Sequence, residues 1–252
     1  MDFLANYFGS LNPMSFLSAL PGNIAQGIIW GLMGLGVFLT FKLLNFADLS
    51  VDGSFATGGA VTAVMLINGC PVWATIIVAI LAGLAAGLVT GLLHTLLGIP
   101  DILAGILTQI ALYSINLNIM GKSNLPISYR NYTLVVSASN INMAILVGLG
   151  ICAVVIAAMY WYFGTEQGST IRSTGSNPAM SKAQGININF TKVIALALSN
   201  GLVALSGSLF AQYQGFADIN MGRGAIVIGL AAVIIGEVLG EAIFRKHMNF
   251  II

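Results

Sequence analysis

The chain has 252 residues, of which 58% are hydrophobic and only 7% are charged, with a formal net charge of +1 and a mean hydropathy of +0.95. A soluble domain carries roughly 25% charged residues, so this surface has too few charges to face water, and lipid is its natural solvent. The near-neutral charge argues against the basic face of a nucleic-acid-binding protein, and Cys70 and Cys152 form no CxxC pair or Cys/His cluster typical of a metal site or a disulfide framework.

The apolar runs, taken in chain order, predict an all-α, polytopic transmembrane helix bundle of about seven spans, because a helix needs about 20 apolar residues to cross a bilayer. Residues 1–19 are mixed and predict an interfacial lead-in, with Asn12-Pro13 and Pro21-Gly22 as breakers. No basic residue precedes Lys42, so the charged start of a signal peptide is missing. The predicted spans cover residues 22–41, 53–68, 72–97, 101–120, 142–163, 191–213 and 222–240.

Breakers and polar stretches separate these spans. Asn68-Gly69-Cys70-Pro71 predicts a turn, and Gly98-Ile99-Pro100-Asp101 ends the third span. Polar loops are expected over 121–141 and 164–190. The span 142–163 ends in an aromatic cluster suited to a membrane interface.

Three glycines four residues apart, Gly83, Gly87 and Gly91, lie on one face of the third predicted span. Small residues at this spacing let two helix backbones approach closely in lipid. Close helix packing is therefore the favoured interpretation, and a direct lining of a solute path is the alternative.

Basic residues indicate the orientation in the membrane, because cytoplasmic loops carry an excess of Lys and Arg. The segment 164–192 is expected to be cytoplasmic and the loop 121–141 external. The side of the N-terminus stays open, since a re-entrant turn at 42–52 and an extra crossing there give opposite parities. The basic residues that indicate the cytoplasmic side are Arg172, Lys182, Lys192, Arg245 and Lys246.

The stretch "NFADLSVDGS" places Asp48 and Asp52, two of only 8 acidic residues, beside strongly apolar sequence. Two aspartates at mid-depth of a bilayer would cost roughly 5–7 kcal/mol on insertion scales. Non-helical backbone is tolerated at membrane depth only where protein or a water-filled cavity satisfies it. We therefore predict a broken or re-entrant segment near 42–54.

Three interpretations of the two carboxylates remain open. They cap a helix that begins near Ser54 at the interface, where the helix dipole favours negative charge; they line or gate a solute path, as at other helix breaks in transporters; or they take part in proton coupling. Asn45, Asp48, Asp52 and Ser54 are the candidate residues of the solute path.

The polar segment 164–190 contains its own helix signals. Asn177 suits the N-cap, Pro178 the first helical position and Gly185 the position after the end, which predicts a short helix over 178–184. Such a helix would dock in a groove of a soluble partner or lie as an ordinary interfacial helix.

Three stretches of the sequence resemble one family in the same order: "LNFADLSVDGSFATGGA", "IRSTGSNPAMSKAQGININ" and "IVIGLAAVIIGE". They are similar to permease subunits of ABC importers in the branched-chain amino acid and ribose permease superfamily. The subgroup most similar to this chain is that of uncharacterised permeases assigned to tryptophan, tyrosine or related solutes. The resemblance covers residues of about 20–240.

The resemblance implies a single transmembrane permease domain over 1–252, in a bacterial cytoplasmic membrane, with 164–190 as a cytoplasmic coupling loop. Its implied partners are cytoplasmic ATPase subunits, an extracytoplasmic solute-binding protein and a second permease copy, as a homodimer or heterodimer. ATP would be bound by the partner, so the chain itself is expected to have no cofactor and no catalytic residue. The residues implied in ATPase coupling are Arg172, Gly175, Asn177, Pro178, Ala179, Lys182 and Gly185.

Members of this family continue for one or two further spans after the stretch that matches 226–237, so a chain that stops at Ile252 is expected to be truncated or a short variant. The alternative function is an ion-coupled secondary transporter in which Asp48 or Asp52 binds a proton or sodium ion. The two functions differ in their energy source.

Overall fold

A computed structural model describes residues 13–127 and 134–244. The first twelve residues of the predicted lead-in, part of the predicted external loop (128–133) and the basic Arg245 and Lys246 lie outside the described residues. The elements are α2 (Pro13–Phe38), the π-helical turn η1 (Leu39–Leu43), α3 (Val51–Ile67), α4 (Val72–Leu97), α5 (Asp101–Met120), β1 (Asn124–Pro126), α6 (Ile141–Phe163), α7 (Glu166–Ser176), α8 (Pro178–Ala183), α9 (Ile188–Gln214), β2 (Phe216–Asp218) and α10 (Ala225–Phe244).

Each of the seven predicted apolar segments is helical, which confirms the all-α membrane bundle. Two of them, α4 and α5, have the predicted bounds. The first helix begins earlier than expected, because Pro21 lies inside α2 and does not end it. A proline removes one backbone hydrogen bond, which a membrane helix tolerates where its surroundings satisfy the freed groups.

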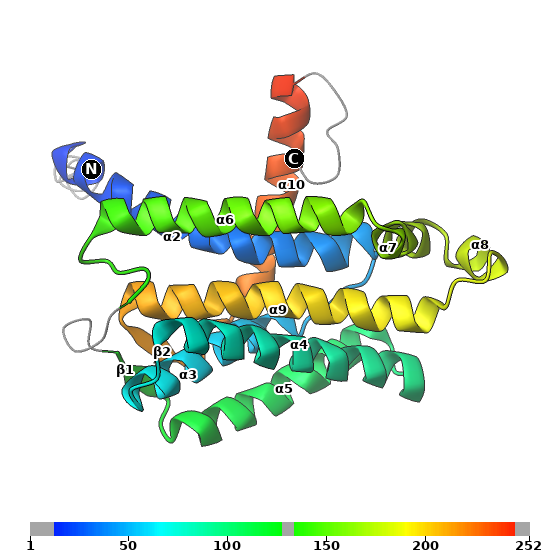
Figure 1. Ribbon diagram of the computed structural model, residues 1–252, viewed down its shortest axis with the longest axis horizontal. Coiled ribbons are helices and arrows are strands. Elements are labelled where there is room, and N and C mark those ends of the chain that lie inside the picture. Colours follow the sequence, from blue (N-terminus) through cyan, green and yellow to red (C-terminus); the bar gives the residue numbers. More distant parts are fainter. Residues whose placement is uncertain (1–12, 128–133, 245–252) are drawn as a thin grey trace, which may run out of the picture.

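The bundle is layered around α9 (Figure 1). This helix contacts α2 on one side and α3 and α4 on the other. In its most apolar stretch of 18 residues, 83% of the residues are buried. The outer helix α6 packs on α2, and α5 packs on α3 and α4. The chain thus surrounds α9 with its own helices and leaves the faces of α5 and α6 largely exposed.

An aromatic cluster fixes the centre of the bundle where α2, α3 and α9 meet. Trp30 stacks on Phe55 with ring centroids 5.2 Å apart, and Phe210 packs against Trp30 edge-on at 5.4 Å. Such pairs contribute about 0.5–1.5 kcal/mol beyond the burial of their area. They join three helices that are far apart in the sequence.

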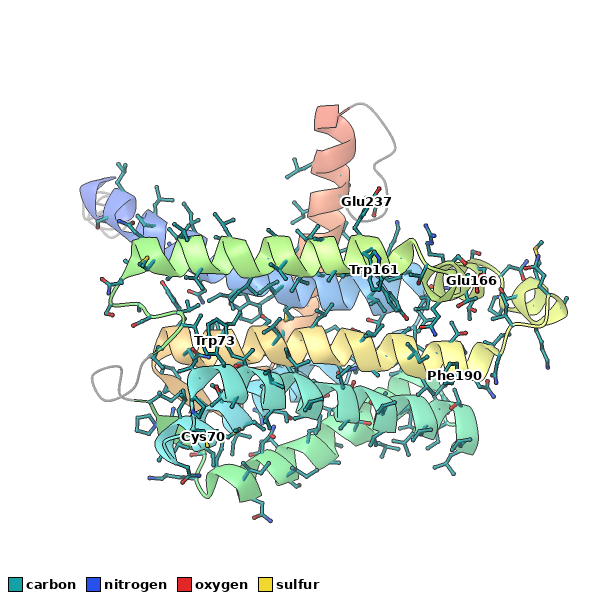
Figure 2. The ribbon with its side chains drawn as sticks, in the orientation of Figure 1. Cys70, Trp73, Trp161, Glu166, Phe190 and Glu237 are labelled. Carbon is teal, nitrogen blue, oxygen red and sulfur yellow. The ribbon has the colours of Figure 1, made fainter. Side chains whose placement is uncertain are left out.

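Five described helical segments are long and apolar enough to cross a membrane: Leu17–Leu43, Val72–Leu97, Asp101–Met120, Ile141–Phe163 and Ile188–Gln214. Val51–Ile67 and Ala225–Gly240 are shorter apolar helices. Trp73 and Trp161 are 70% and 75% exposed and lie toward opposite ends of the bundle (Figure 2). Exposed tryptophans at both ends are typical of the two interfaces of a membrane protein.

The two ends of the bundle differ. At one end, β1 and β2 pair antiparallel, with Leu125 opposite Ala217, and at the other end lie α7 and α8 (Figure 1). The last helix, α10, runs across the long helices, and its C-terminal part projects beyond them. An exposed ion pair joins it to η1, with Lys42 Nζ 2.8 Å from Glu237 Oε1.

The predicted break near 42–54 is present as a defined backbone path. After Phe38 the helix widens into η1, where the Leu44 N–H donates to the Leu39 carbonyl. Asn45 then has a φ of +54°, a left-handed conformation that asparagine tolerates better than most residues. The chain turns there and starts again as α3 at Val51.

The glycine face of α4 packs against α9, which confirms the packing interpretation. Cβ atoms built at Gly83 and Gly87 would collide with the backbone of Asn200 and Leu196, and one at Gly91 would lie 2.9 Å from the Val193 Cα. The two backbones therefore approach more closely than any other residue type allows.

The close contact of α4 with α9 predicts that Gly87→Ala lowers the stability of the protein. The added methyl group would meet the Leu196 carbonyl, and overpacking of this kind costs about 1–3 kcal/mol. We expect the thermal unfolding temperature of the purified protein in detergent to fall. Gly150→Ala is the matched control, because nothing lies within 4 Å of a Cβ at that position of α6. An equal fall in both variants would contradict the packing argument.

Candidate functional site

The buried carboxylate of Asp48 is the centre of a polar network inside the bundle. Asp48 is 2% exposed, and its Oδ1 accepts hydrogen bonds from the Ser50 backbone N–H at 2.8 Å and the Ser50 hydroxyl at 2.5 Å. Its Oδ2 accepts from Asn200 Nδ2 at 2.7 Å. These donors are all neutral, and a buried carboxylate tolerates its desolvation only when its oxygens are hydrogen-bonded in this way.

Asn200, near the middle of α9, joins the break to the central helix. Its Nδ2 donates to Asp48 and to the Leu196 carbonyl, and its Oδ1 accepts from the Ser54 hydroxyl at 2.5 Å. Asn200 and Ser54 are fully buried. One side chain of α9 therefore bonds a polar group within the break and another in the first turn of α3.

Asp52 has a different environment from Asp48. It lies in the first turn of α3, but its carboxylate accepts from the backbone N–H groups of Gly224 at 3.0 Å and Ile226 at 2.9 Å. It thus caps the start of α10, where the orphan N–H groups and the helix dipole favour an anion. The backbone of Gly222 also packs directly on the Asp52 carbonyl.

The prediction that both aspartates cap a helix beginning near Ser54 is wrong about where the helix begins and about which helix Asp52 caps. The helix α3 starts at Val51, so Asp52 is already inside it and its side chain turns toward α10. Asp48 accepts from the Ser50 N–H in the turn before α3, and it is buried inside the bundle.

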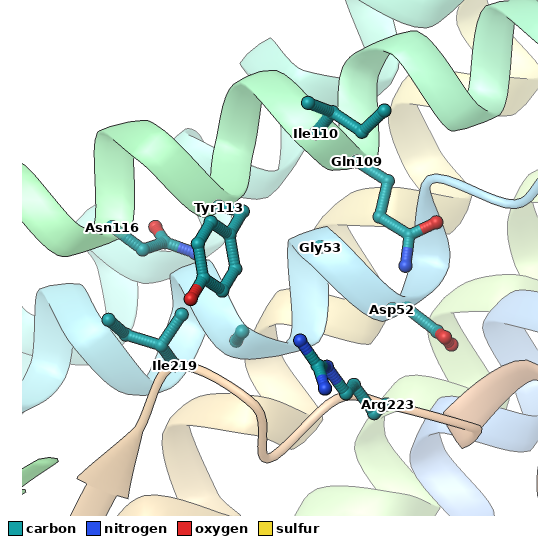
Figure 3. A pocket seen from close by; sticks show the side chains of 9 residues that line it. Asp52, Gly53, Gln109, Ile110, Tyr113, Asn116, Ile219 and Arg223 are labelled. Atoms are coloured by element: carbon teal, nitrogen blue, oxygen red, sulfur yellow. The ribbon is translucent and has the colours of Figure 1, made fainter. Parts of the chain in front are cut away.

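A cavity of about 280 Å³ opens beside Asp52, between α3, α5 and the turn that follows β2 (Figure 3). Its polar lining comes from four residues besides Asp52, all on other elements. This volume is close to the lower end of the range for small-molecule sites, about 300–1,000 Å³. The lining residues are Asp52, Gly53, Ala56, Gln109, Ile110, Tyr113, Asn116, Ile219 and Arg223.

Four polar side chains of this cavity make no hydrogen bond or ion pair within the described part of the chain. Asn116 is the extreme case, because it is 1% exposed and both its Oδ1 and its Nδ2 are unpartnered. Figure 3 shows that the side chains of Gln109, Tyr113 and Arg223 point into the same space. Tyr113 and Arg223 are exposed and Gln109 is half-buried, so only Asn116 is both buried and unpartnered. A buried polar group without a partner costs about 1–3 kcal/mol, so the Asn116 amide calls for an occupant that bonds to it.

The four predicted pathway residues are not all brought together. Asp48 and Ser54 belong to the buried network around Asn200, and Asp52 lines the cavity. Asn45 is exposed at the left-handed turn and does not line the cavity.

The segment 164–190 forms two helices rather than the single predicted one. The second, α8, has the expected signals: Asn177 Oδ1 accepts from the Met180 N–H at 3.0 Å, Pro178 is at the first position, and Gly185 follows with a φ of +84°. Lys182 and Ala179 are exposed. The first helix, α7, was not expected, because Gly168 and Gly175 lower its helix propensity.

Those two glycines are where α7 packs against its neighbours. Gly175 lies directly on the Leu43 carbonyl at the end of η1, and Gly168 lies on the Phe163 backbone. Arg172 Nη2 donates to the Phe163 carbonyl at 3.0 Å. These contacts with the end of α6 and with η1 therefore outweigh the low helix propensity of α7.

Several residues of the site are not evident from the sequence. Asn116 and Asn200 are polar residues within apolar spans, but the same spans carry others, such as Gln109 and Ser199, so this signal does not single them out. Gln109, Tyr113 and Arg223 are brought to the cavity only by the packing of α5 and the turn before α10. Within the described ranges, no group of three or more His, Cys, Asp or Glu side chains is arranged to bind a metal ion.

Comparison with known proteins gives a consistent result. The family described as "Branched-chain amino acid transport system / permease component" matches residues 22–244. A tyrosine transport system permease protein of Clostridioides difficile (strain R20291) is 45% identical over 224 residues, which cover 88% of this chain and 74% of the relative. A D-allose transport system permease protein of Escherichia coli (strain K12) is 28% identical over 234 residues, covering 91% of this chain and 71% of that one.

An uncharacterized protein of Rickettsia prowazekii (strain Madrid E) is also similar, at 32% identity over 226 residues, 90% of this chain and 78% of the relative. No solved structure matches the chain significantly.

The network around Asp48 predicts that Asp48→Asn lowers stability. In either orientation the new amide nitrogen would face a donor, the Ser50 N–H or Asn200 Nδ2, and two donors cannot bond each other, so at least one buried group loses its partner. The expected loss in the free energy of unfolding is about 1–3 kcal/mol, measured by thermal or denaturant unfolding in detergent. Asp101→Asn, at the half-buried start of α5, is the control. Equal stability of the Asp48 variant and the wild type would contradict the assigned network.

Proposed function

The chain belongs to the family of permease components of branched-chain amino acid transport systems, and on this premise we propose that it forms the path of a small polar solute and is driven by ATPases that dock on α8. The protein is a multi-pass protein of the bacterial cytoplasmic membrane and a transport subunit of the ABC class, not an enzyme.

The main support for docking at α8 is that this helix is exposed. Ser181 is its one buried residue, and Met180 in the middle of the helix is 59% exposed. The helix projects from the end of the bundle (Figure 1). An exposed apolar side chain on a capped helix, with Lys182 beside it, suits insertion into a groove of a cytoplasmic protein.

The contacts of α7 supply a route from the docking helix to the solute path. α7 continues into α8 through Asn177, and its Gly175 rests on the Leu43 carbonyl. The break that follows η1 leads to Asp48 and then to Asp52 beside the cavity. We infer that movement of α8 by the ATPases shifts η1 and so reshapes the cavity, which requires a two-state arrangement of this break.

The solute is proposed to be small and polar, and an amino acid in particular. The support is the cavity beside Asp52, with its unpartnered polar side chains and its volume of about 280 Å³. Among the relatives, one is named for tyrosine transport and another for D-allose transport. The proposed partners are an extracytoplasmic solute-binding protein at the end that carries β1 and β2, and a second permease copy.

Replacement of residues 178–184 by a Gly/Ser linker tests the docking role. We expect the variant to insert normally but to lose co-purification of its ATPase and ATP-dependent uptake in proteoliposomes, because the capped helix is absent. Ser139→Ala, in the exposed loop before α6, is the control. Unchanged ATPase yield would contradict docking at α8, and uptake driven by an ion gradient without any ATPase would favour the secondary-transporter alternative.

Gly175→Ala tests the transmission step separately. A methyl group here would collide with the Leu43 carbonyl, and displacing the α7–η1 contact costs about 1–3 kcal/mol. We expect the ATPase to bind and hydrolyse ATP while ATP-dependent uptake falls several-fold. Ser176→Ala, at the exposed neighbouring position, should transport normally. Full uptake by the Gly175 variant would count against this route.

A further inference from the structure

We propose that the cavity beside Asp52 is a binding site for a zwitterionic α-amino acid, whose carboxylate pairs with Arg223 and whose ammonium group pairs with Asp52. Asn116 and Tyr113 receive the side chain, which carries a hydrogen-bonding group such as a hydroxyl. This inference rests on the proposed transport function and specifies its solute and the residues that select it.

The two charged groups of the cavity have opposite signs and stay apart. Asp52 and Arg223 both line the cavity, yet they do not form an ion pair with each other. The carboxylate of Asp52 is held by the N–H groups at the start of α10, which fixes its position. The guanidinium of Arg223 has no hydrogen-bonding partner within the described residues.

A zwitterion has charges that are complementary to those of Asp52 and Arg223. A guanidinium presents a planar set of donors that matches a carboxylate in a bidentate fashion. A carboxylate that already accepts two backbone hydrogen bonds still has lone pairs for an ammonium group. A neutral sugar has no charged group to offer either the exposed Arg223 or Asp52, so it would gain less from these two residues than a zwitterion does.

The unpartnered amide of Asn116 indicates what kind of side chain the bound amino acid carries. Figure 3 shows Asn116 and Tyr113 on one side of the cavity and Asp52 with Gln109 on the other, so the two ends of a ligand have separate surroundings. The Asn116 amide has a donor and an acceptor free. A hydroxyl group is also both, and can therefore satisfy the amide. Sites built around such a bond discriminate strongly against ligands that lack it.

Equilibrium binding of radiolabelled L-tyrosine to the purified full-length permease in lipid nanodiscs tests the site. The competitors are tyramine, which lacks the carboxylate, N-acetyl-L-tyrosine, which lacks the ammonium group, L-phenylalanine, which lacks the hydroxyl, and D-allose, which carries no charge. We expect each to compete at least roughly ten-fold more weakly than unlabelled L-tyrosine, since each loses a hydrogen bond to a charged or buried group.

Variants assign the individual contacts. Arg223→Gln should weaken L-tyrosine binding roughly ten- to a hundred-fold and leave tyramine binding unchanged, because only the former has a carboxylate to lose. Asn116→Leu should abolish the preference for L-tyrosine over L-phenylalanine. Lys122→Gln is the matched control, since it removes one exposed cation at the end of α5, outside the cavity. A merely structural role of Arg223 would weaken both ligands alike.

The outcomes separate this inference from the proposed function. Equal competition by D-allose, equal loss of L-tyrosine and tyramine in Arg223→Gln, or no L-tyrosine binding by a permease that still imports it with ATP would each overturn the zwitterion site and leave the ATPase-driven function intact. Normal L-tyrosine binding together with ATP-independent uptake would support the site and overturn the proposed energy source.

Discussion

The hydrogen bonds of Asn200 are the constraint on which the rest of this structure depends. A bilayer offers no water to a free backbone or a carboxylate, so a break in a helix persists only where the protein itself supplies partners. Asn200, on the most buried helix, bonds Asp48 on one side and Ser54 on the other. Asp48 in turn accepts from the Ser50 N–H, so the carboxylate and a backbone donor of the break are both bonded inside the bundle.

The break also lies between the two regions proposed to be functional. At η1 the break meets Gly175 of α7, and at its other end it leads through Asp52 to the start of α10. The break therefore lies between the proposed docking helix and the proposed solute cavity and contacts the elements next to each.

Close packing of small residues compensates for the lack of a hydrophobic driving force between helices in lipid. The backbones of α4 and α9 approach at Gly83 and Gly87, and those of α3 and α9 at Gly58 and Gly207. Cohesion thus comes from backbone approach around α9. The cavity lies away from this tightly packed centre, where α5 and the turn before α10 leave room for polar side chains.

The sequence by itself determined the bundle, its apolar segments, the glycine face of α4, the break near 42–54 and the cap of α8, because these depend on hydropathy, spacing and local capping. Only the tertiary structure decided that Asp52 caps α10 rather than its own helix, that α7 forms, and that Asn116 and Arg223 share a cavity with Asp52. These outcomes depend on contacts between residues far apart in the chain. Local propensity contains no information about which distant donor meets a carboxylate, or which side chains are left without a partner.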